Sequence, residues 1–429
     1  MLVALKLIVD AWILRQGFTH VSDDDYSRTT ISELFAKTPR LDPSGTSWLP
    51  LPFWVEGGIL MLFGRSLSMA RAVAIALGAA CIVLPRTAMR VAGMRRRVAL
   101  VATATVLVLP WNAWLGVATV PDGWTGALAA AAVIGALTDP SHRTAWAAAL
   151  LAAALSRYET WPACAVVAAF LFTDGARAGR LRKALLPIAL CAAGPVAWMA
   201  WNAHAHGSLV HFLTRVSAFR RASGGAAVPL SQKLFGYPRA LWADTPEVVV
   251  LGVLALLGFG LVPELRKRWG RATLVAGAVL LFLVAGDVGD GAPTHHPARA
   301  LVMTWWILAP AGIEAIGNLV HRLPRWGRPF RSATVSALCA GAIAWCIALP
   351  TRWAASPGRT PWDDRRPQIA RGLDLRERRV SGVTIVPCQF EHFALLAAWG
   401  QPERAVLLPR SGAPPGPECP WVQESDKPR

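Results

Sequence analysis

Three consecutive aspartates, Asp23, Asp24 and Asp25, are followed by Tyr26 and form the residue group best suited to acid–base chemistry. Adjacent carboxylates repel one another, so we expect at least one to hold its proton more tightly unless a cation or a metal ion neutralises the group. Such a carboxylate can accept a proton from a hydroxyl group, which makes the triplet a candidate general base. The alternative is a solvated acidic turn or a helix N-terminus, where capping and the helix dipole favour aspartate.

A second polar group is the segment 156–161, Ser-Arg-Tyr-Glu-Thr-Trp, which lies between two apolar runs. Charged residues at the tip of a membrane hairpin are costly and usually have a partner. Arg157 and Glu159 could pair with each other or anchor the hairpin at the interface, and together with Tyr158 they are also site candidates. Asp122, which follows a proline, adds one more carboxylate in a short turn, where aspartate alone is ordinary turn chemistry.

The candidate ligands for an anion are arginines, because a guanidinium group can hold two phosphate oxygens at once. Three of them, Arg215, Arg220 and Arg221, fall in the loop 204–245 that is expected outside the membrane, and Arg299 opens the crossing at 299–319 from the outer side. Each could equally be an interfacial anchor or a solvated charge. His295 and His296 precede Arg299; two adjacent histidines on a helix do not easily face one metal ion, so we favour hydrogen bonding or phosphate contact there. A divalent cation at the aspartate triplet stays open, since no complete ligand set is visible.

The elements that must position these residues are membrane helices. Of the 429 residues, 54% are apolar and 16% are charged, against roughly 25% charged in soluble domains, which excludes a large soluble enzyme. The net charge of +18 would suggest nucleic acid in a soluble protein, but the basic residues punctuate apolar runs, so we expect membrane lipids and no nucleic acid as partners. Eight runs approach the roughly 20 residues that cross a bilayer: 68–85, 98–116, 123–138, 184–203, 246–263, 272–286, 299–319 and 332–350.

The sequence therefore predicts an all-α polytopic membrane protein with about eleven crossings. The first expected crossing, residues 2–14, is only a short apolar run and carries Lys6 and Asp10. We therefore expect either a tilted helix or a true start upstream of the given one. No cleavable signal peptide is evident, since no small-residue cleavage site follows the run. Arginine-rich loops belong in the cytoplasm by the positive-inside rule. We accordingly expect a bacterial inner (plasma) membrane protein whose first loop, 18–67, basic loop, 204–245, and C-terminal tail face outward.

Two parts are expected: residues 1–351 form the membrane domain, and residues 352–429 form an outward tail. Within the membrane domain, the apolar stretch 48–64 contains two prolines and two adjacent glycines, so we place it along the outer surface rather than across the bilayer. The tail pattern predicts a small β-α-β unit, with strands at 383–387 and 405–408 around a short helix at 391–399.

The seven cysteines carry little expected chemistry. Cys388 and Cys419 lie in the outward tail, where an oxidising compartment could pair them, and the sequence leaves that pairing open. The other five lie in apolar runs and are expected to act as small packing residues.

These motifs resemble the GT-C class of integral-membrane glycosyltransferases, especially the protein O-mannosyltransferase and aminoarabinose transferase relatives. In that class an acidic pair followed by an aromatic residue begins the first outer loop, as Asp23-Asp24-Asp25-Tyr26 does, although the usual pair is Asp-Glu. The stretch from Trp48, Trp-Leu-Pro-Leu-Pro, is similar to a His-Pro-Pro-Leu-like segment without its histidine. The segment 157–161, Arg-Tyr-Glu-x-Trp, resembles an Arg-Tyr-Glu-Gly-Trp pattern. The resemblance covers roughly residues 1–350 and implies outer-face juxtamembrane helices in the first loop.

The resemblance implies an inverting transfer of a hexosyl or pentosyl group from a polyprenyl-phosphate donor to a lipid, glycan or protein acceptor at the outer face. One aspartate of the triplet would deprotonate the acceptor, and the four arginines would stabilise the departing phosphate. Two other functions stay open. A lipid or anionic-solute transporter or flippase predicts charges buried in mid-span, where the sequence has only Asp10 and Glu314 as acidic residues. A non-catalytic subunit of an envelope assembly would bind its partner through the tail.

Overall fold

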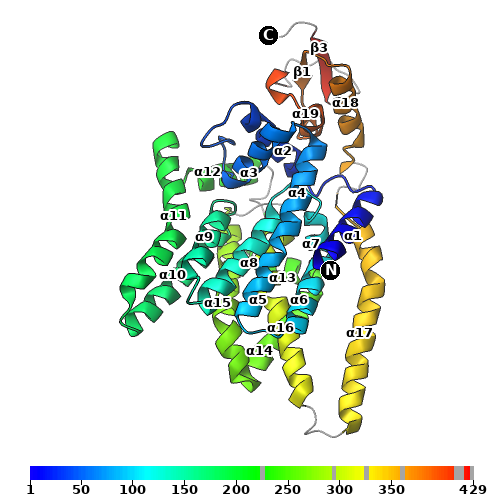
Figure 1. Cartoon of the computed structure of the whole chain (residues 1–429). Helices are drawn as coiled ribbons and strands as arrows, with labels where there is room; N and C mark the ends of the chain where they lie inside the picture. The colour runs from blue at the N-terminus through cyan, green and yellow to red at the C-terminus, as the bar shows by residue number, and fades with distance from the viewer. Residues whose placement is uncertain (223–227, 292–295, 323–327, 358–362, 410–419, 426–429) are drawn as a thin grey trace.

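The computed structural model describes the chain except for residues 223–227, 292–295, 323–327, 358–362, 410–419 and 426–429. Helices dominate the described part, and they form a bundle with a small α/β tail at one end (Figure 1). This end of the bundle is called the tail-bearing end below.

Five helical segments are long and apolar enough to cross a membrane. They comprise α4 and α5 (Leu67–Cys81 and Val83–Val91), α11 (Leu181–His206), α15 (Pro263–Val288), η2 with α16 (Pro297–Leu301 and Val302–Arg322), and α17 (Arg328–Ala354). The pair α13 (Leu230–Asp244) and α14 (Pro246–Leu261) passes the same test only together, with a bend of 102° between them. Five or six spans are therefore supported among the described residues, and the count of eleven stays a prediction.

Shorter helices fill the rest of the bundle: α1 (Leu2–Arg15), α6 (Arg96–Val108), α7 (Pro110–Leu115), α8 (Asp122–Thr138), α9 (Arg143–Ala154) and α10 (Thr160–Arg177). The centre of the bundle is α8, whose buried face is mostly alanine. A Cβ atom on Gly126 of α8 would lie 2.5 Å from Val302 of α16, and one on Gly312 of α16 would lie 2.2 Å from the Leu251 carbonyl oxygen. Small residues thus let α16 approach both α8 and α14 closely.

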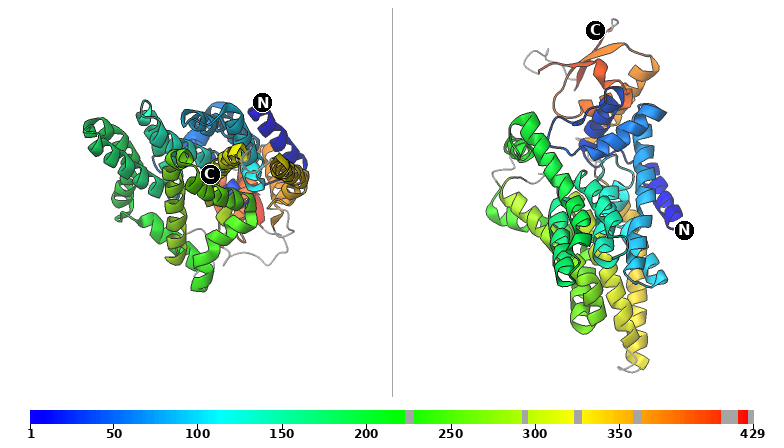
Figure 2. Two further views of the ribbon diagram at one scale, coloured as in Figure 1. Left: turned by 90° about the horizontal axis from the view of Figure 1, so that it is seen from below. Right: turned by 60° about the vertical axis from the view of Figure 1, so that its left-hand side comes forward.

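The first loop folds into a helical hairpin of α2 (Asp24–Lys37) and α3 (Leu51–Phe63) at the tail-bearing end (Figure 2). Helix α2 begins with two aspartates in its first turn, where the helix dipole favours negative charge. Gly57 of α3 permits the close contact with α2, because a Cβ atom there would lie 2.6 Å from Phe35 Cδ1 and 2.8 Å from the Ser32 carbonyl oxygen. The apolar stretch expected at 48–64 is thus largely α3, which is shorter than the candidate spans.

The segment expected to be a loop at 204–245 is mostly helical in its described part. It contains the end of α11, α12 (His211–Ala222) and α13. Lys233, Tyr237 and Leu241 recur at every fourth position of α13 and are buried, so one face of this helix packs inward. The expectation of a loop rested on the many basic residues and did not use the four-residue spacing of these positions.

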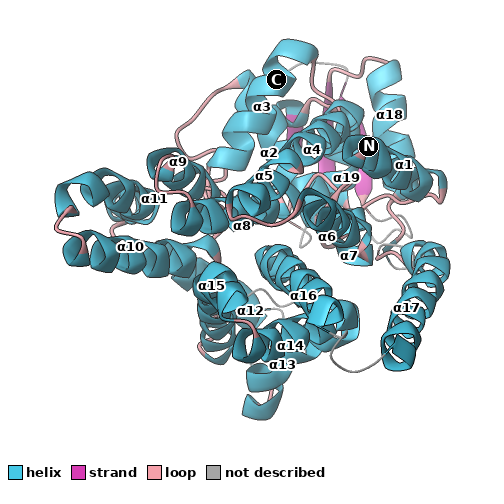
Figure 3. Ribbon diagram, turned by 60° about the horizontal axis from the view of Figure 1, so that its bottom comes forward, coloured by secondary structure: helices cyan, strands magenta, loops and turns pink. Residues whose placement is uncertain are grey.

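The tail contains the predicted β-α-β unit and two further elements. Strand β1 (Gly382–Val386) pairs parallel with β2 (Ala405–Leu407), and α19 (His392–Trp399) connects them, which confirms the predicted order. The additions are α18 (Arg366–Glu377) and β3 (Trp421–Ser425), which pairs antiparallel with β1. The sheet order is β2-β1-β3, and Figure 3 shows these strands in magenta behind the helices.

Cysteine positions agree only in part with the expectation. Cys164 and Cys191 are buried in the bundle as predicted, whereas Cys339 and Cys346 are exposed on α17, a helix with few contacts to the rest of the bundle. Cys388 is disulfide-bonded, and Cys419 lies outside the described residues.

Candidate active site

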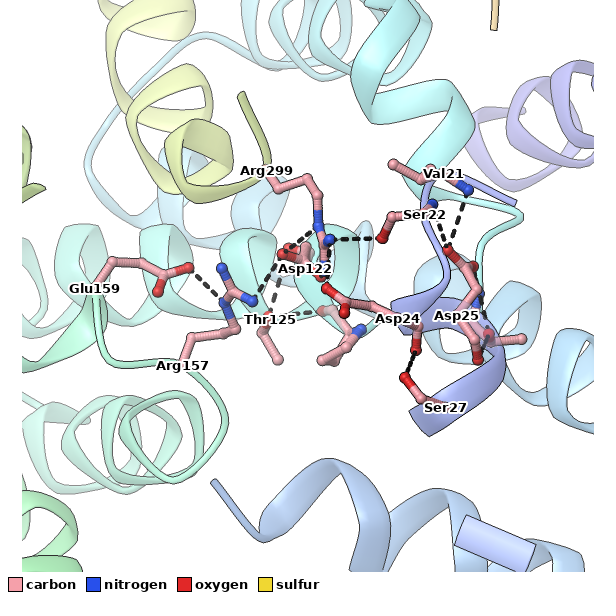
Figure 4. Close-up of polar contacts among 12 residues, drawn as sticks. Val21, Ser22, Asp24, Asp25, Ser27, Asp122, Thr125, Arg157, Glu159 and Arg299 are labelled. Atoms are coloured by element: carbon pink, nitrogen blue, oxygen red, sulfur yellow. Dashed lines mark hydrogen bonds and ion pairs between the residues drawn. The ribbon is translucent and has the colours of Figure 1, made fainter. Parts of the chain in front are cut away.

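The three aspartates of the triplet do not form one cluster, because each carboxylate has different partners. Asp25 is buried and accepts hydrogen bonds from the backbone N–H groups of Val21 (3.1 Å), Ser22 (3.3 Å) and Thr119 (2.8 Å) (Figure 4). The Thr119 hydroxyl also donates to the Asp25 carbonyl oxygen at 2.7 Å. Asp25 therefore fastens the start of α2 to the segment before α8.

Asp23 and Asp24 pair with arginines from different segments of the chain. The Asp23 carboxylate accepts two hydrogen bonds from Arg365 of the tail, at 2.8 Å from Nε and 2.9 Å from Nη2. Asp24 Oδ2 accepts a hydrogen bond from Arg299 Nη1 at 2.8 Å, and its side chain is 26% exposed. The expected mutual repulsion within the triplet is thus relieved by separate partners: arginines for Asp23 and Asp24, and backbone N–H groups for Asp25. Among the three, Asp24 alone pairs with Arg299, and so with the polar groups described next.

Asp122 is the buried centre of this polar group. Arg299 approaches it with Nε and Nη2, each at 3.3 Å from one carboxylate oxygen, and Arg157 Nη1 lies 2.9 Å from Oδ1. Burial alone would raise the pKa of Asp122, but Arg157 and Arg299 outweigh burial and hold this pKa below its ordinary value. Asp122 therefore stays ionised, although the sequence offered only a turn residue.

Arg157 extends the same chain of charges. Its Nε donates to Glu159 Oε1 at 2.6 Å, so of the alternatives left open by the sequence the internal pair is present, and Arg157 bridges Glu159 to Asp122. Burial lowers the pKa of Arg157, but the attraction of Asp122 and Glu159 raises it by more, so the net shift of this pKa is upward. We call the alternating series Asp24, Arg299, Asp122, Arg157 and Glu159 the ion network.

Arg28 lies beside the ion network and was not among the residues that sequence reasoning selected. It is 5% exposed, and its Nε and Nη1 have no hydrogen-bond partner in the described part of the chain. The guanidinium carbon is 4.4 Å from the ring centroid of Trp48, a cation–π contact. Burial lowers the pKa of Arg28 to about 10, against the opposing attraction of Asp24 and Asp122, so the group remains charged at neutral pH.

A signal for Arg28 existed in the sequence. It lies four residues after Asp24 on a helix-like stretch, and residues four apart share one helix face. A buried cation with unused donors is able to bind an anion such as a phosphate. Trp48, a predicted site candidate, is therefore placed at the site through its contact with Arg28.

The two tyrosines among the candidates support the site from outside the network. Tyr158 stacks on Phe212 of α12 with 4.5 Å between ring centroids, and its hydroxyl accepts a hydrogen bond from Trp198 Nε1 at 2.9 Å. Tyr26 is fully buried against the tail, and its hydroxyl donates to the Thr19 carbonyl oxygen at 3.3 Å. Both rings hold segments that carry the ion network.

Of the four arginines expected to bind phosphate, the structure brings only Arg299 into the ion network. Arg220 of α12 is buried and pairs instead with Asp287 at 2.5 Å and with Asp290 at 3.5 Å. Arg215 and Arg221 are exposed on the same helix. The prediction had grouped them by loop, whereas the helix directs them to different sides.

The histidines precede η2, the turn that carries Arg299. His296 lies against Trp111, with 5.4 Å between ring centroids, and its carbonyl oxygen accepts the Arg299 backbone N–H at 3.1 Å. His295 lies outside the described residues. Within the described ranges, no group of three or more His, Cys, Asp or Glu side chains is placed to hold a metal ion.

The two mid-span acids have local partners. Asp10 accepts a hydrogen bond from Lys6 of the same helix at 2.6 Å. Glu314 accepts hydrogen bonds from Arg268 and from Trp269 Nε1. Both are neutralised by pairs within the helix bundle, as buried charges require.

Comparison with known proteins finds similarity in structure only. No family model matches the chain, and no curated protein sequence matches it. Crystal structures of ArnT from Cupriavidus metallidurans, one bound to undecaprenyl phosphate and one in the apo state, align with it at a TM-score of 0.50 and sequence identities of 18% and 16%. Each alignment covers 94% of this chain and 74% of ArnT. The chain therefore has an ArnT-like GT-C fold, which confirms the fold resemblance predicted from the sequence.

Proposed function

We propose that this chain is an inverting glycosyltransferase that moves a sugar from a polyprenyl-phosphate donor to an acceptor, with Asp24 as the general base. The observation that carries the proposal is the contrast within the triplet. Asp25 is buried in backbone hydrogen bonds and Asp23 is paired with the tail, whereas Asp24 is partly exposed and pairs with Arg299. Beside this pair lies Arg28, whose Nε and Nη1 have no hydrogen-bond partner among the described residues. An ArnT-like fold supports a membrane donor, because one of those crystal structures is bound to undecaprenyl phosphate.

In this mechanism Asp24 takes the proton of the acceptor hydroxyl or amine as the acceptor atom attacks the anomeric carbon. The bond from that carbon to the phosphate oxygen breaks, and the lipid phosphate leaves with the bonding electron pair. A single displacement of this kind inverts the anomeric configuration.

Arg28 and Arg299 stabilise the negative charge that develops on the departing phosphate. Arg28 supports this role because two of its nitrogens have no protein partner among the described residues. Arg299 is held between Asp24 and Asp122, so its guanidinium is oriented before any substrate arrives. Preorganised donors of this type lower the barrier more than groups that must reorient during the reaction.

The position of the site fits a lipid donor. Helix α2, which begins with Asp24, lies at the tail-bearing end of a bundle of apolar helices (Figure 1), and Arg299 pairs with Asp24 there. The arginine-rich loops support an orientation in which this end faces outward from a bacterial inner membrane. The proposal covers hexosyl and pentosyl donors and leaves the acceptor as a lipid, a glycan or a protein.

The experiment uses the purified full-length chain in liposomes with a panel of polyprenyl-phosphate sugars and a cell-envelope extract as acceptor. We expect labelled sugar to appear in the acceptor with an equal amount of released polyprenyl phosphate and with inverted anomeric configuration. Failure of every donor, together with movement of intact donor across the bilayer, would instead support a transporter.

A further inference from the structure

The tail reaches the first turn of α2 through one strong ion pair. Arg365 donates to both oxygens of the Asp23 carboxylate, a bidentate arrangement that fixes orientation as well as charge. The two residues are 342 positions apart in the chain. The Arg365 side chain is 11% exposed and immediately precedes α18, the first helix of the tail.

Two other contacts dock the tail without touching the triplet. Tyr26 and Leu67 pack in one apolar cluster with Ala394 and Ala397 of α19. Arg65 pairs with Glu403 at 2.7 Å on the surface. The tail therefore has attachments of its own, so the pair between Asp23 and Arg365 is not its sole anchor.

We propose that Arg365 is a positioning residue that lets Asp24, rather than Asp23, engage Arg299. The inference deepens the proposed function and rests on Asp24 being the base. Asp23 is the N-cap of α2 and Asp24 is its first residue, so the two carboxylates start from adjacent positions of one helix. Arg365 holds the Asp23 carboxylate on the tail side, so Arg299 is left to Asp24 and Asp122.

The charges around Asp23 make Arg365 difficult to replace. On its own element Asp23 is followed by Asp24 and Asp25, and His392 of the tail and His20 of the preceding segment interact with it. The tail carboxylates Asp363 and Glu391 act on Arg365, and Arg28, one turn further along α2, is attracted by Asp24. Burial lowers the pKa of both His20 and His392, so neither supplies a positive charge near pH 7. Without Arg365, Asp23 would be left beside Asp24 with no tail cation and would compete for Arg299.

The test compares Arg365→Met with Arg366→Met in the full chain. Arg366 is the matched control, because it is the adjacent residue, is 74% exposed and pairs with Asp364 rather than with the triplet. We expect Arg365→Met to lower kcat about tenfold, with a smaller change in the donor KM, and to move the acidic limb of the pH–rate profile to higher pH, since an unpaired neighbouring carboxylate makes Asp24 harder to ionise. Arg366→Met should retain the wild-type rate and profile.

A double variant separates charge control from mere docking. Adding Asp23→Asn to Arg365→Met removes the competing carboxylate, so we expect the acidic limb to return to its wild-type position. Arg65→Met, which breaks the other ion pair between tail and bundle, should leave the pH profile unchanged. If Arg365→Met and Arg65→Met behave alike, or if the double variant does not restore the limb, the positioning role is wrong.

A measurement independent of activity distinguishes this failure from failure of the proposed function. Amide hydrogen exchange in residues 21–30 should increase in Arg365→Met and stay at the wild-type level in Arg366→Met. If exchange is faster in Arg365→Met than in the wild type, but the wild type transfers no sugar, the tail positions α2 and the proposed function is wrong. Unchanged exchange alongside normal transfer would overturn the positioning role alone.

Discussion

Arg299 contacts Asp122 through two nitrogens, Nε and Nη2, each 3.3 Å from a different carboxylate oxygen, and both side chains are buried. The pair joins the turn before α16 to the first residue of α8. Glycines at the contact of these helices allow that approach, since Gly126 would clash with Val302 if it carried a Cβ atom. Helix packing in the bundle thus sets the position of the cation that Asp24 pairs with.

Asp122→Asn should destabilise the protein. The change removes the negative charge that Arg157 and Arg299 share, and breaking a buried ion pair costs about 3–5 kcal/mol. The measurement is thermal unfolding of the purified protein in detergent, where we expect a clear fall in Tm and loss of sugar transfer. Asp374→Asn is the control, because Asp374 is 55% exposed and far from the ion network in sequence. An unchanged Tm for Asp122→Asn would contradict a structural role for the pair.

Arg28→Met should weaken donor binding without lowering the stability of the protein. A buried cation with unused donors is costly to the fold, so we expect Tm to be retained or to rise. Loss of a charged hydrogen-bond donor to phosphate should weaken donor binding about 10- to 100-fold. The check is titration with polyprenyl phosphate alone, beside Arg215→Met as an exposed control on α12. Equal affinity in Arg28→Met and the wild type would remove Arg28 from the phosphate site.

Glu56 predicts a pH dependence of stability. It is 8% exposed in α3, and burial raises its pKa to about 8, against the attraction of Arg28. Because the folded-state pKa lies above the unfolded value, the neutral acid favours folding. This contribution is complete below about pH 4.5 and is lost as pH rises through about 8.

The wild-type free energy of unfolding should therefore fall by about 2–4 kcal/mol between pH 5 and pH 9 through Glu56. Glu56→Gln cannot ionise, so its Tm should fall less over the same range and exceed the wild-type Tm at pH 9. Glu377→Gln, an exposed change at the end of α18, serves as the control. Parallel pH profiles for the wild type and Glu56→Gln would show that Glu56 is ionised in the folded protein at neutral pH.

Local patterns in the sequence predicted several elements correctly. The helix N-terminus that was one alternative for the aspartate triplet is the start of α2, and the predicted β-α-β order of the tail is confirmed. Both follow from the helix dipole and from the alternation of apolar residues, which act over a few residues. The pair between Arg157 and Glu159 was one of the alternatives that the sequence left open, since its members are two positions apart.

The rest of the site depends on contacts that no local pattern contains. The role of Asp122 comes from Arg157 and Arg299, and the role of Asp23 comes from Arg365 in the tail. The four arginines expected at a phosphate site looked equivalent in the sequence, yet Arg220 pairs with Asp287 because α12 directs it there. Only the packing of distant helices distinguishes these residues.

The most direct test of the account measures sugar transfer and Tm for Asp23→Asn, Asp24→Asn and Asp25→Asn. Each variant is purified and placed in liposomes, and sugar transfer is measured with a polyprenyl-phosphate sugar that the wild type uses. We expect Asp24→Asn to lower the transfer rate about 10²–10⁴-fold, which is the usual contribution of general-base catalysis, with Tm near the wild-type value. Asp25→Asn should lower Tm, because it weakens three backbone hydrogen bonds, and Asp23→Asn should retain most of the activity. Full activity in Asp24→Asn, with loss only in Asp23→Asn or in a stably folded Asp25→Asn, would contradict the assignment of Asp24 as the base.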